Sequence, residues 1–515
     1  MSVLGLDIGT TGCKAVVFAP DGEILASAYE EYPLVFPRPG WAELDSHGVW
    51  AAVQRVVAAA ASGASDPVEA LSVSVFGESF LPVDSSGEPL YNTILSFDAR
   101  AQAQADRLAE KLGREAIFQI TGMPQHSSYT VNKVMWLRDH EPEIFKSASK
   151  MLLWEDYFCL KCGLEPHVDY SVIGRTLALD VRTKRWAEPI FEAAELDPGL
   201  FATPCPSGQV LGEVSRKAAA QLGLPPGVKV VAGGHDQPAC ALGAGVVAPG
   251  VSTDTTGTVE CMTMAMAEPV LTDAMLASNI CVYPHVVPGR YVSLAYLYTA
   301  GSILRWFRDH FGADARAVAE STGRDVYDVL IDAAPDGPID LFLLPHFQGS
   351  GTPYLDSDSR GLLAGLTLNT QAQDVTRAIL DGVAYEMRMN LEAVQAGGLA
   401  VEKFCAIGGG SRSDAWCQTK ADVTGLPVDA LDVSEAGCLG VAMLAGAATG
   451  IWPSIDEAIS QLVRVRQSFA PDPAHQALYE RAFEVYRRIY ASCADLNHAI
   501  AAFAGELHDL RKGAR

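Results

Sequence analysis

The chain has 515 residues, of which 49% are hydrophobic and 19% are charged, and its formal net charge is −24. A chain of this length is too long for one hydrophobic core, so we expect about two to four domains. The acidic excess, which no cluster of Lys and Arg offsets, argues against a nucleic acid as a partner. The chain begins directly with a strand pattern and has no basic leader. We therefore expect a cytoplasmic protein with no membrane partner.

Strand-like runs alternate with helical patterns along the whole chain, which predicts an α/β fold. Strands are expected at 3–6, 15–18, 71–75, 228–232, 252–255, 259–264 and 404–407. Helices are expected at 45–61, 130–140, 241–246, 302–311, 374–396, 414–424 and 435–449, with one long surface helix at 473–497. The 11 cysteines are scattered, and the pair Cys159 and Cys162 has no second pair at zinc spacing. We interpret them as structural thiols.

The first strand pattern runs into a turn with the composition of a phosphate-binding site. The turn combines glycines, hydroxyl side chains and a cation: Gly9, Thr10, Thr11, Gly12 and Lys14. The glycines let the backbone approach an anion with its N–H groups exposed, and the other side chains add donors and positive charge. Asp7 fits beside a phosphate mainly when a divalent cation lies between them. An ordinary glycine-rich hairpin is the alternative interpretation.

The segment 251–259 repeats this pattern about 245 residues later, with Asp254, two threonines and Gly257 after a strand. Two such hairpins, separated by half the chain, predict two similar domains that face each other across a cleft. A chance likeness of short Thr/Gly strings is the alternative. We place the division near residues 243–249 and assign residues 1–245 and 246–515 to the N-terminal and C-terminal domains.

Four further segments carry polar groups. Asp236, in the string Gly-Gly-His-Asp-Gln after a strand pattern, can accept a proton from a substrate hydroxyl, with His235 as a rival base. A helix N-cap is the alternative for Asp236. The glycine-rich turn at 408–414 lets a phosphate or a flat ligand approach the backbone, unless it is only a tight loop. Glu78 and Asp98 can accept hydrogen bonds from several hydroxyls of a polyol, unless they are solvated loop residues.

Together these strings resemble the FGGY family of carbohydrate kinases, whose fold consists of two actin-like (ribonuclease H-like) domains around a nucleotide cleft. Residues 128–140 are similar to the first family signature, with Lys133 and Trp136 at the expected spacing. Residues 361–381 are similar to the second signature. With the hairpins and the glycine-rich turns in the expected order, the resemblance extends over about residues 3–450.

The resemblance implies phosphorylation of a sugar or polyol hydroxyl with ATP and Mg2+. It gives Asp236 the position of the catalytic base and Asp7 that of a metal-associated carboxylate. The nucleotide-side positions are Thr10, Thr11, Lys14, Gly257, Thr258, Gly301, Gly409, Gly410 and Ser413. The substrate-side positions are Glu78, Asp98, Arg100 and Gln237. Asp414 replaces a residue that is often neutral in the family, so we assign it no contact. A homodimer is the assembly that the family suggests.

The acceptor is predicted from the expected charge of the pocket. The string Phe97-Asp98-Ala99-Arg100 resembles Trp-Asn-Asp-x-Arg of pentulose kinases. If Glu78, Asp98 and Asp236 share one pocket, an anionic acceptor such as gluconate meets like charges without a compensating arginine. We therefore expect a neutral sugar, D-xylulose first, ahead of another ketopentose, glycerol, erythritol or gluconate. An actin-like or chaperone-like ATPase is the alternative from a different class.

Overall fold

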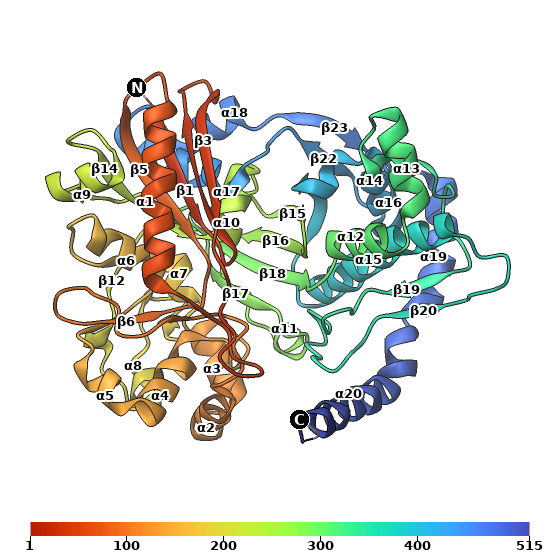
Figure 1. Ribbon diagram of the computed structural model, residues 1–515, viewed down its shortest axis with the longest axis horizontal. Coiled ribbons are helices and arrows are strands. Elements are labelled where there is room, and N and C mark those ends of the chain that lie inside the picture. The colour runs from red at the N-terminus through yellow and green to blue at the C-terminus, as the bar shows by residue number, and fades with distance from the viewer. Residues whose placement is uncertain (1, 514–515) are drawn as a thin grey trace.

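The computed structural model describes residues 2–513, with side chains through Leu507. Two large mixed sheets form two halves of the molecule, each flanked by helices (Figure 1). The N-terminal sheet contains, in spatial order, β13 (Val210–Glu213), β14 (Lys229–His235), β5 (Val68–Val75), β1 (Ser2–Ile8), β2 (Gly12–Phe18) and β3 (Ile24–Glu31). The C-terminal sheet contains β17 (Cys281–Pro284), β18 (Tyr291–Leu297), β16 (Glu260–Met266), β15 (Gly250–Thr256), β21 (Val401–Ile407), β22 (Val428–Leu431) and β23 (Val465–Phe469).

Short ladders and helices surround the two sheets. The ladders pair β4 (Glu43–Leu44) with β7 (Thr93–Ile94), β6 (Leu81–Val83) with β8 (Lys150–Leu152), β9 (His167–Asp169) with β12 (Thr203–Cys205), β10 (Leu179–Asp180) with β11 (Arg185–Trp186), and β19 (Phe342–Leu344) with β20 (Leu362–Ala364). The N-terminal half carries α1 (Ser46–Gly63), α2 (Gln102–Leu112), α3 (Arg114–Thr121), α4 (Thr130–His140), α5 (Pro142–Ser147), α6 (Trp154–Lys161), α7 (Tyr170–Gly174), α8 (Glu188–Ala194), α9 (Arg216–Leu222) and α10 (Asp236–Gly243).

The second half of the chain contributes α11 (Asp273–Ala277), α12 (Gly301–His310), α13 (Ala313–Thr322), α14 (Val326–Asp332), α15 (Ala372–Ala396), α16 (Asp414–Thr424), α17 (Ala436–Thr449), α18 (Ile455–Leu462), α19 (Pro473–Tyr486) and α20 (Ile489–Gly513). Among the described helices, none combines the length and the hydropathy that crossing a bilayer requires.

The two sheets repeat one arrangement, which confirms the predicted fold class. In the first, β1 pairs with β2 in antiparallel and with β5 in parallel register. In the second, β15 pairs in the same way with β16 and with β21. The central strand β1 is apolar because both faces of the sheet are covered, and its Val3, Leu4 and Leu6 are fully buried. Each half therefore begins with the same kind of hairpin.

Two of the predicted helices differ from those observed by more than two residues at one or both ends. The helix expected at 241–246 begins earlier, at Asp236, because β14 ends at the preceding residue, His235, and α10 ends at Gly243. The single helix expected at 473–497 is wrong, since the chain turns after Tyr486 and α20 starts at Ile489. Tertiary packing fixes this break: the ring of Tyr490 stacks on that of Tyr354 at 3.8 Å, an interaction that helical periodicity does not reveal.

Helix α17 belongs to the second half of the chain but covers the N-terminal sheet (Figure 1). Most of its residues are buried, as expected for a helix that is apolar on all sides. It crosses α10 so closely that a Cβ atom on Gly440 would lie 2.0 Å from the carbonyl oxygen of Ala239. A Cβ atom on Gly5, in β1, would lie 2.0 Å from the carbonyl oxygen of Cys438. Glycine at these two positions lets α17 pack directly against the backbone of α10 and of β1, and this close packing holds the two halves together.

Gly440→Ala should therefore destabilise the protein by about 1–3 kcal/mol or more, because the new methyl group meets backbone that cannot move alone. Gly505→Ala is the matched control, since nothing lies within 4 Å of a Cβ atom there and the site is a helix. It should leave stability unchanged or slightly raised. The melting temperatures of the two variants test this. Equal melting temperatures would contradict the close-packing argument.

Candidate functional site

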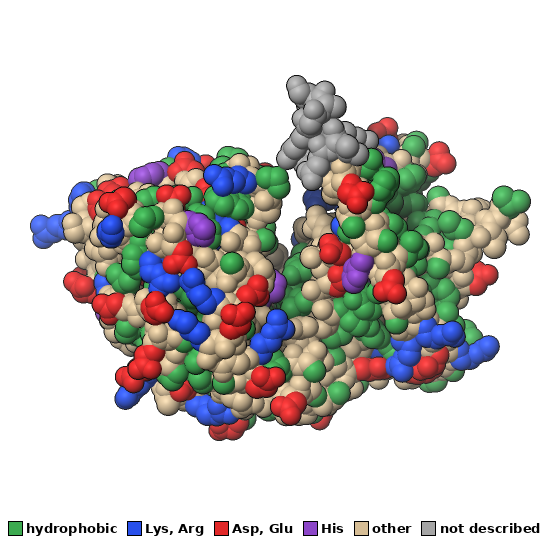
Figure 2. All heavy atoms as spheres, turned by 90° about the horizontal axis from the view of Figure 1, so that it is seen from below, with side chains coloured by type: hydrophobic (Ala, Val, Ile, Leu, Met, Phe, Trp, Pro, Cys, Tyr) green, Lys and Arg blue, Asp and Glu red, His purple; other side chains and the backbone are tan. Residues whose placement is uncertain are grey.

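Three parallel strands of the N-terminal sheet end side by side. The register pairs Ile8 of β1 with Val75 of β5, and Val75 with His235 of β14. The residues that follow these strands therefore meet at one edge of the sheet, where α/β proteins bind ligands. They include the first glycine-rich turn, the turn that contains Glu78, and Asp236. In the space-filling view, a deep notch separates the two halves of the molecule (Figure 2).

Asp236 is the first residue of α10, and its carboxyl group can accept more hydrogen bonds than the described residues donate to it. Its side chain is 32% exposed, and among the described residues its Oδ1 has no hydrogen-bond partner of normal geometry. The Oε1 of the next residue, Gln237, also lacks a partner there. Burial, together with the negative charges of Asp7 and Glu78, raises the pKa of Asp236 to about 7. A carboxyl with this pKa can exchange a proton near neutral pH, and unpaired oxygens of this kind are expected where a ligand binds.

Asp7 lies at the end of β1, opposite Lys14 of β2 in the antiparallel register. Burial raises the pKa of the Asp7 carboxyl. The Nζ of Lys14 lies 2.7 Å from Oε1 of Glu435, which precedes α17, so this predicted nucleotide-side cation bridges the two halves. The predicted Thr10 and Thr11 form the turn between these strands, and Thr11 is exposed.

The carboxylates fit a magnesium ion only when other ligands complete its shell. Asp7 raises the pKa of Asp236, so the two carboxyl groups influence each other as like charges. Among the described residues, no three His, Cys, Asp or Glu side chains gather in a way that would hold a metal ion by themselves. Mg2+ is commonly bound by one or two carboxylates, with phosphate oxygens and water as the remaining ligands. The donor set is therefore compatible with a metal that arrives with a phosphate ligand.

Glu78 is held by an arginine that the sequence analysis did not select. It has a φ of 59°, a conformation that costs about 1–3 kcal/mol for a residue with a side chain. The Nε of Arg175 donates to Oε1 of Glu78 at 2.7 Å, and the hydroxyl of Thr130 donates to the Glu78 carbonyl at 2.8 Å. Arg175 also lies over the rings of Tyr129 and Tyr283, at 5.7 and 5.1 Å. Glu78 is thus fixed and charge-balanced.

Asp98 and Arg100 were predicted on the substrate side, but the structure places them in a buried network of ion pairs with Glu43. Asp98 accepts from Nε of Arg100 at 2.8 Å and from the backbone N–H of Ala42 at 2.6 Å. Arg100 also donates to Glu43 at 2.7 Å, and its guanidinium lies 3.9 Å from the ring centre of Trp41. The side chains of Asp98 and Arg100 are fully buried. The expected pocket of three uncompensated carboxylates is therefore not formed.

Lys133, from the first signature, is a buried cation. Its Nζ donates to the carbonyl of Leu95, and burial lowers the pKa of Lys133 to about 7 despite the attraction of Glu78 and Asp98. Its contact with Leu95 fixes the start of the loop that carries Asp98. The signature singled out Lys133 without assigning it a role, and Arg175 belongs to no selected motif, so spacing alone could not assign either residue a place at this site.

The nucleotide-side residues predicted in the second half also come together. The N–H of Gly301, at the start of α12, donates to the carbonyl of Gly257 at 3.0 Å, and the N–H of Ala300 donates to that of Thr258 at 3.0 Å. Gly257, Thr258 and Gly409 are exposed. Gly410 lies so close to β15 that a Cβ atom there would be 2.6 Å from the side chain of Thr256. The second hairpin, the start of α12 and the glycine-rich turn therefore form one continuous surface.

Two predicted positions at this turn have structural partners. The hydroxyl of Ser413 accepts from the N–H of Trp416 at 3.2 Å and caps α16. Asp414, to which the sequence assigned no contact, pairs with Arg466 at 2.7 Å. Behind the turn, Nζ of Lys420 lies 2.7 Å from Asp254 Oδ1 and 2.9 Å from Glu260 Oε1, and this buried pairing ties α16 to the second hairpin.

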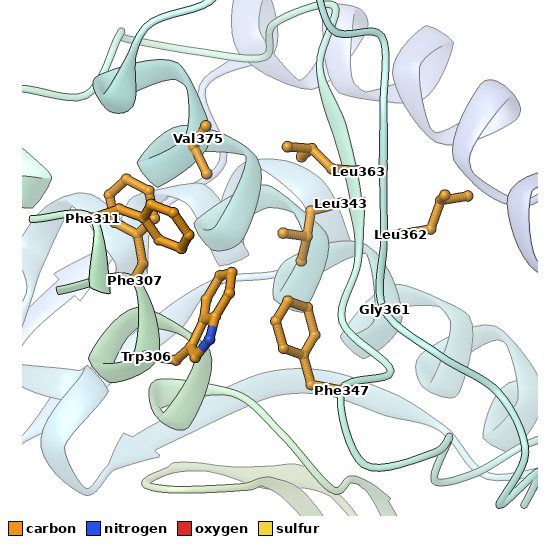
Figure 3. A pocket seen from close by; sticks show the side chains of 9 residues that line it. All are labelled: Trp306, Phe307, Phe311, Leu343, Phe347, Gly361, Leu362, Leu363 and Val375. Carbon is orange, nitrogen blue, oxygen red and sulfur yellow. The ribbon is translucent and has the colours of Figure 1, made fainter. Parts of the chain in front are cut away.

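An apolar pocket of about 420 Å³ lies elsewhere in the C-terminal half, between α12, α15 and the β19–β20 ladder (Figure 3). The rings of Trp306 and Phe347 meet in it edge to face, with their centres 5.0 Å apart. The residues that line the pocket are Trp306, Phe307, Phe311, Leu343, Phe347, Gly361, Leu362, Leu363 and Val375. A polyhydroxylated ligand would find few hydrogen-bond partners among these residues, so we do not place a sugar there.

The fold and the site define a class of protein: a two-domain α/β protein whose halves repeat one hairpin-and-sheet arrangement and share a polar cleft. Within this class the chain belongs to the FGGY family of carbohydrate kinases, since the family's N-terminal domain model matches residues 2–243 and its C-terminal domain model matches residues 254–449. The predicted family is thereby confirmed. Membership also favours a sugar kinase over an actin-like or chaperone-like ATPase.

Relatives with different named substrates are similar over nearly the whole chain. Xylulose kinase from Bacillus subtilis (strain 168) is 28% identical over 97% of this chain and 99% of its own length. Autoinducer-2 kinase from Salmonella choleraesuis (strain SC-B67) is 30% identical over 95% of this chain and 94% of its own. Among solved structures, xylulose kinase and gluconate kinase from Lactobacillus acidophilus have TM-scores of 0.87 and 0.86, at 22% and 23% identity, each over 96% of this chain and 98% of its own. The two structures show the shared fold alone.

The raised pKa of Asp236 predicts a pH-dependent stability. The carboxyl of an unfolded Asp has a pKa of about 4. Between that value and about 7, the folded protein binds a proton that the unfolded chain does not, so its free energy of unfolding falls as the pH rises. Asn cannot ionise. Asp236→Asn should therefore raise the free energy of unfolding by on the order of 2 kcal/mol at pH 8, allowing for partial exposure, and by little at pH 4.

Denaturant unfolding at the two pH values, in the presence of EDTA, measures this difference. Asp495→Asn, which changes an exposed carboxyl on α20, is the control and should have little effect at either pH. A gain for Asp236→Asn that is the same at pH 4 and pH 8 would contradict the assignment of a raised pKa.

Proposed function

We propose that this protein transfers the γ-phosphoryl group of ATP to a primary hydroxyl of a neutral sugar, with D-xylulose as the first candidate. The observation that carries the proposal is the start of α10, where, among the described residues, no cation pairs with the partly exposed Asp236 carboxyl and Gln237 Oε1 has no hydrogen-bond partner. The raised pKa of Asp236 and the position of the residue at the carboxyl edge of the sheet support the role of a base.

In the proposed mechanism, Asp236 orients the acceptor hydroxyl and accepts its proton as the oxygen attacks phosphorus. Gln237 and Glu78 hold neighbouring hydroxyls, and Arg175 keeps the Glu78 carboxylate in place. The exposed backbone of the second hairpin and of the glycine-rich turn receives the nucleotide, with Thr10, Thr11 and Lys14 on the opposite side. Mg2+ beside Asp7, when bound with ATP, would neutralise charge on the phosphate oxygens.

The choice of acceptor rests on different evidence from the choice of reaction. Arg175 balances Glu78, and Arg100 balances Asp98, so repulsion no longer argues strongly against an anionic sugar acid. The proposal of D-xylulose now relies on the xylulose kinase relatives and on the string at 97–100. The autoinducer-2 kinases at 30% identity make autoinducer-2 the second candidate acceptor.

Asp236→Asn should lower kcat by about 10²–10⁴-fold, because Asn keeps the size of the side chain but cannot accept the proton. The dissociation constant of ATP should change less than about threefold, a free-energy change well below 1 kcal/mol. A coupled assay of ADP formation and a calorimetric titration with ATP measure these quantities. A variant that retains near-normal kcat would refute the base assignment.

A panel of acceptors tests the substrate. With ATP and Mg2+ at saturation, kcat/KM for D-xylulose should exceed that for glycerol, erythritol and gluconate by at least about tenfold, which is about 1.4 kcal/mol of discrimination. D-Ribulose and autoinducer-2 complete the panel. Equal turnover of gluconate and D-xylulose would overturn the neutral-sugar proposal, and preference for autoinducer-2 would replace D-xylulose with the second candidate.

A further inference from the structure

His235 lies directly before Asp236 and is buried, with 4% of its surface exposed. Its Nε2 is 3.2 Å from Asp236 Oδ1, and its Nδ1 is 2.9 Å from the hydroxyl oxygen of Tyr283. Tyr283 is fully buried and comes from β17, which belongs to the second sheet. The imidazole therefore bridges a carboxylate that faces the cleft and a phenol that solvent does not reach.

The surroundings fix the position of the ring. The backbone N–H of His235 donates to the hydroxyl of Ser171, in α7, at 2.8 Å. On the other side is Gly77, where a Cβ atom would lie 2.8 Å from both Cδ2 and Nε2 of the imidazole. Any other residue at position 77 would push the ring away from its place. The glycine before Glu78 thus makes room for the histidine of another strand.

The groups beside the two ring nitrogens of His235 favour one tautomer of the imidazole. Burial, with the nearby charge of Arg175, lowers the pKa of His235 well below its usual range, so the imidazole is neutral and carries one N–H. Burial also raises the pKa of Tyr283, so its hydroxyl keeps its proton. In the ionised form of Asp236, the form that can accept a proton, a proton on Nδ1 of His235 would leave a lone pair of Nε2 facing the carboxylate. With Tyr283 donating to Nδ1, the N–H is on Nε2 and points to the carboxylate.

We infer that His235 and Tyr283 form a positioning relay, in which Tyr283 fixes the Nε2–H tautomer and His235 holds Oδ1 of Asp236. Oδ2 is then free to accept the proton of the sugar hydroxyl. The inference rests on the proposed function, because it assumes that Asp236 is the base. The 3.2 Å separation does not have the geometry of a full hydrogen bond, and catalytic hydrogen bonds often align only when substrate binds.

Substitutions that keep or remove the donor test the relay. His235→Leu should lower kcat by about 10–100-fold, as removal of a partner that orients a functional ligand commonly does. His235→Gln, which keeps an N–H donor, should recover about tenfold of that loss. The KM for ATP should stay within about twofold in both variants, because the ring's partners Asp236, Tyr283 and Gly77 lie outside the nucleotide-side turns. Similar kcat losses in both variants, or a kcat for His235→Leu within twofold of the original, would overturn the relay.

Tyr283→Phe tests the tautomer itself. Without the phenol, Nδ1 is free to carry the proton, so ¹⁵N NMR of histidine-labelled protein should show a shift of His235 from the Nε2–H toward the Nδ1–H form. The kcat should fall less than in His235→Leu. Tyr486→Phe is the matched control, since Tyr486 is equally buried and donates to Glu386 at 2.7 Å within the C-terminal half. An unchanged His235 spectrum in Tyr283→Phe would refute the tautomer assignment.

Asp236→Asn separates the failure of the relay from that of the proposed function. If Asp236→Asn is inactive while His235→Leu is normal, only the relay fails. If Asp236→Asn remains active, the base assignment fails first, and the relay that depends on it fails with it.

Discussion

The close crossing of α10 and α17 is the constraint on which the site depends. These helices meet between the two sheets with glycine at the contact points, so backbone rests on backbone at Gly440 of α17 and at Gly243 of α10. α10 begins with Asp236, and Glu435 at the start of α17 pairs with Lys14 of the first hairpin. One packed contact therefore sets the positions of the proposed base and of the first glycine-rich hairpin. Because close-packed backbone resists small displacements, these distances are held without a covalent link.

The carboxylates near the cleft are of two kinds: those that arginines and N–H groups of the fold pair with, and one that has no cationic partner in the described part of the chain. Asp98 has a full set of partners within the fold, and Glu78 is held by Arg175. Among the described residues Asp236 has no cationic partner, since the imidazole of His235 beside it is neutral, and burial and like charge raise the pKa of Asp236. A fold tolerates an unfavourable carboxyl of this kind where binding or chemistry needs its free oxygens. The same difference explains why two acidic residues that look alike in the sequence have different roles in the structure.

Local patterns predicted the sheets well and the helix ends less well. The helices at 130–140 and 414–424 were found at their expected bounds, since apolar periodicity and flanking polar residues define them. The break after Tyr486 was missed, because a tyrosine contact with a distant loop decides it. At the site, strings of glycine and threonine identified both hairpins. Arg175 was missed because it lies in no such string, although it is bonded to a glutamate 97 residues away.

The sequence by itself determined the α/β class, the repeated hairpins and the family, because strand alternation and turn composition are properties of neighbouring residues. It also located Asp236 where a strand gives way to a helix. Only the tertiary structure decided which carboxylates are free, since that depends on which arginines and backbone N–H groups packing brings to them. It likewise placed Tyr283 beside His235. Such pairings between distant parts of the chain follow from three-dimensional packing and leave no periodic trace in the sequence.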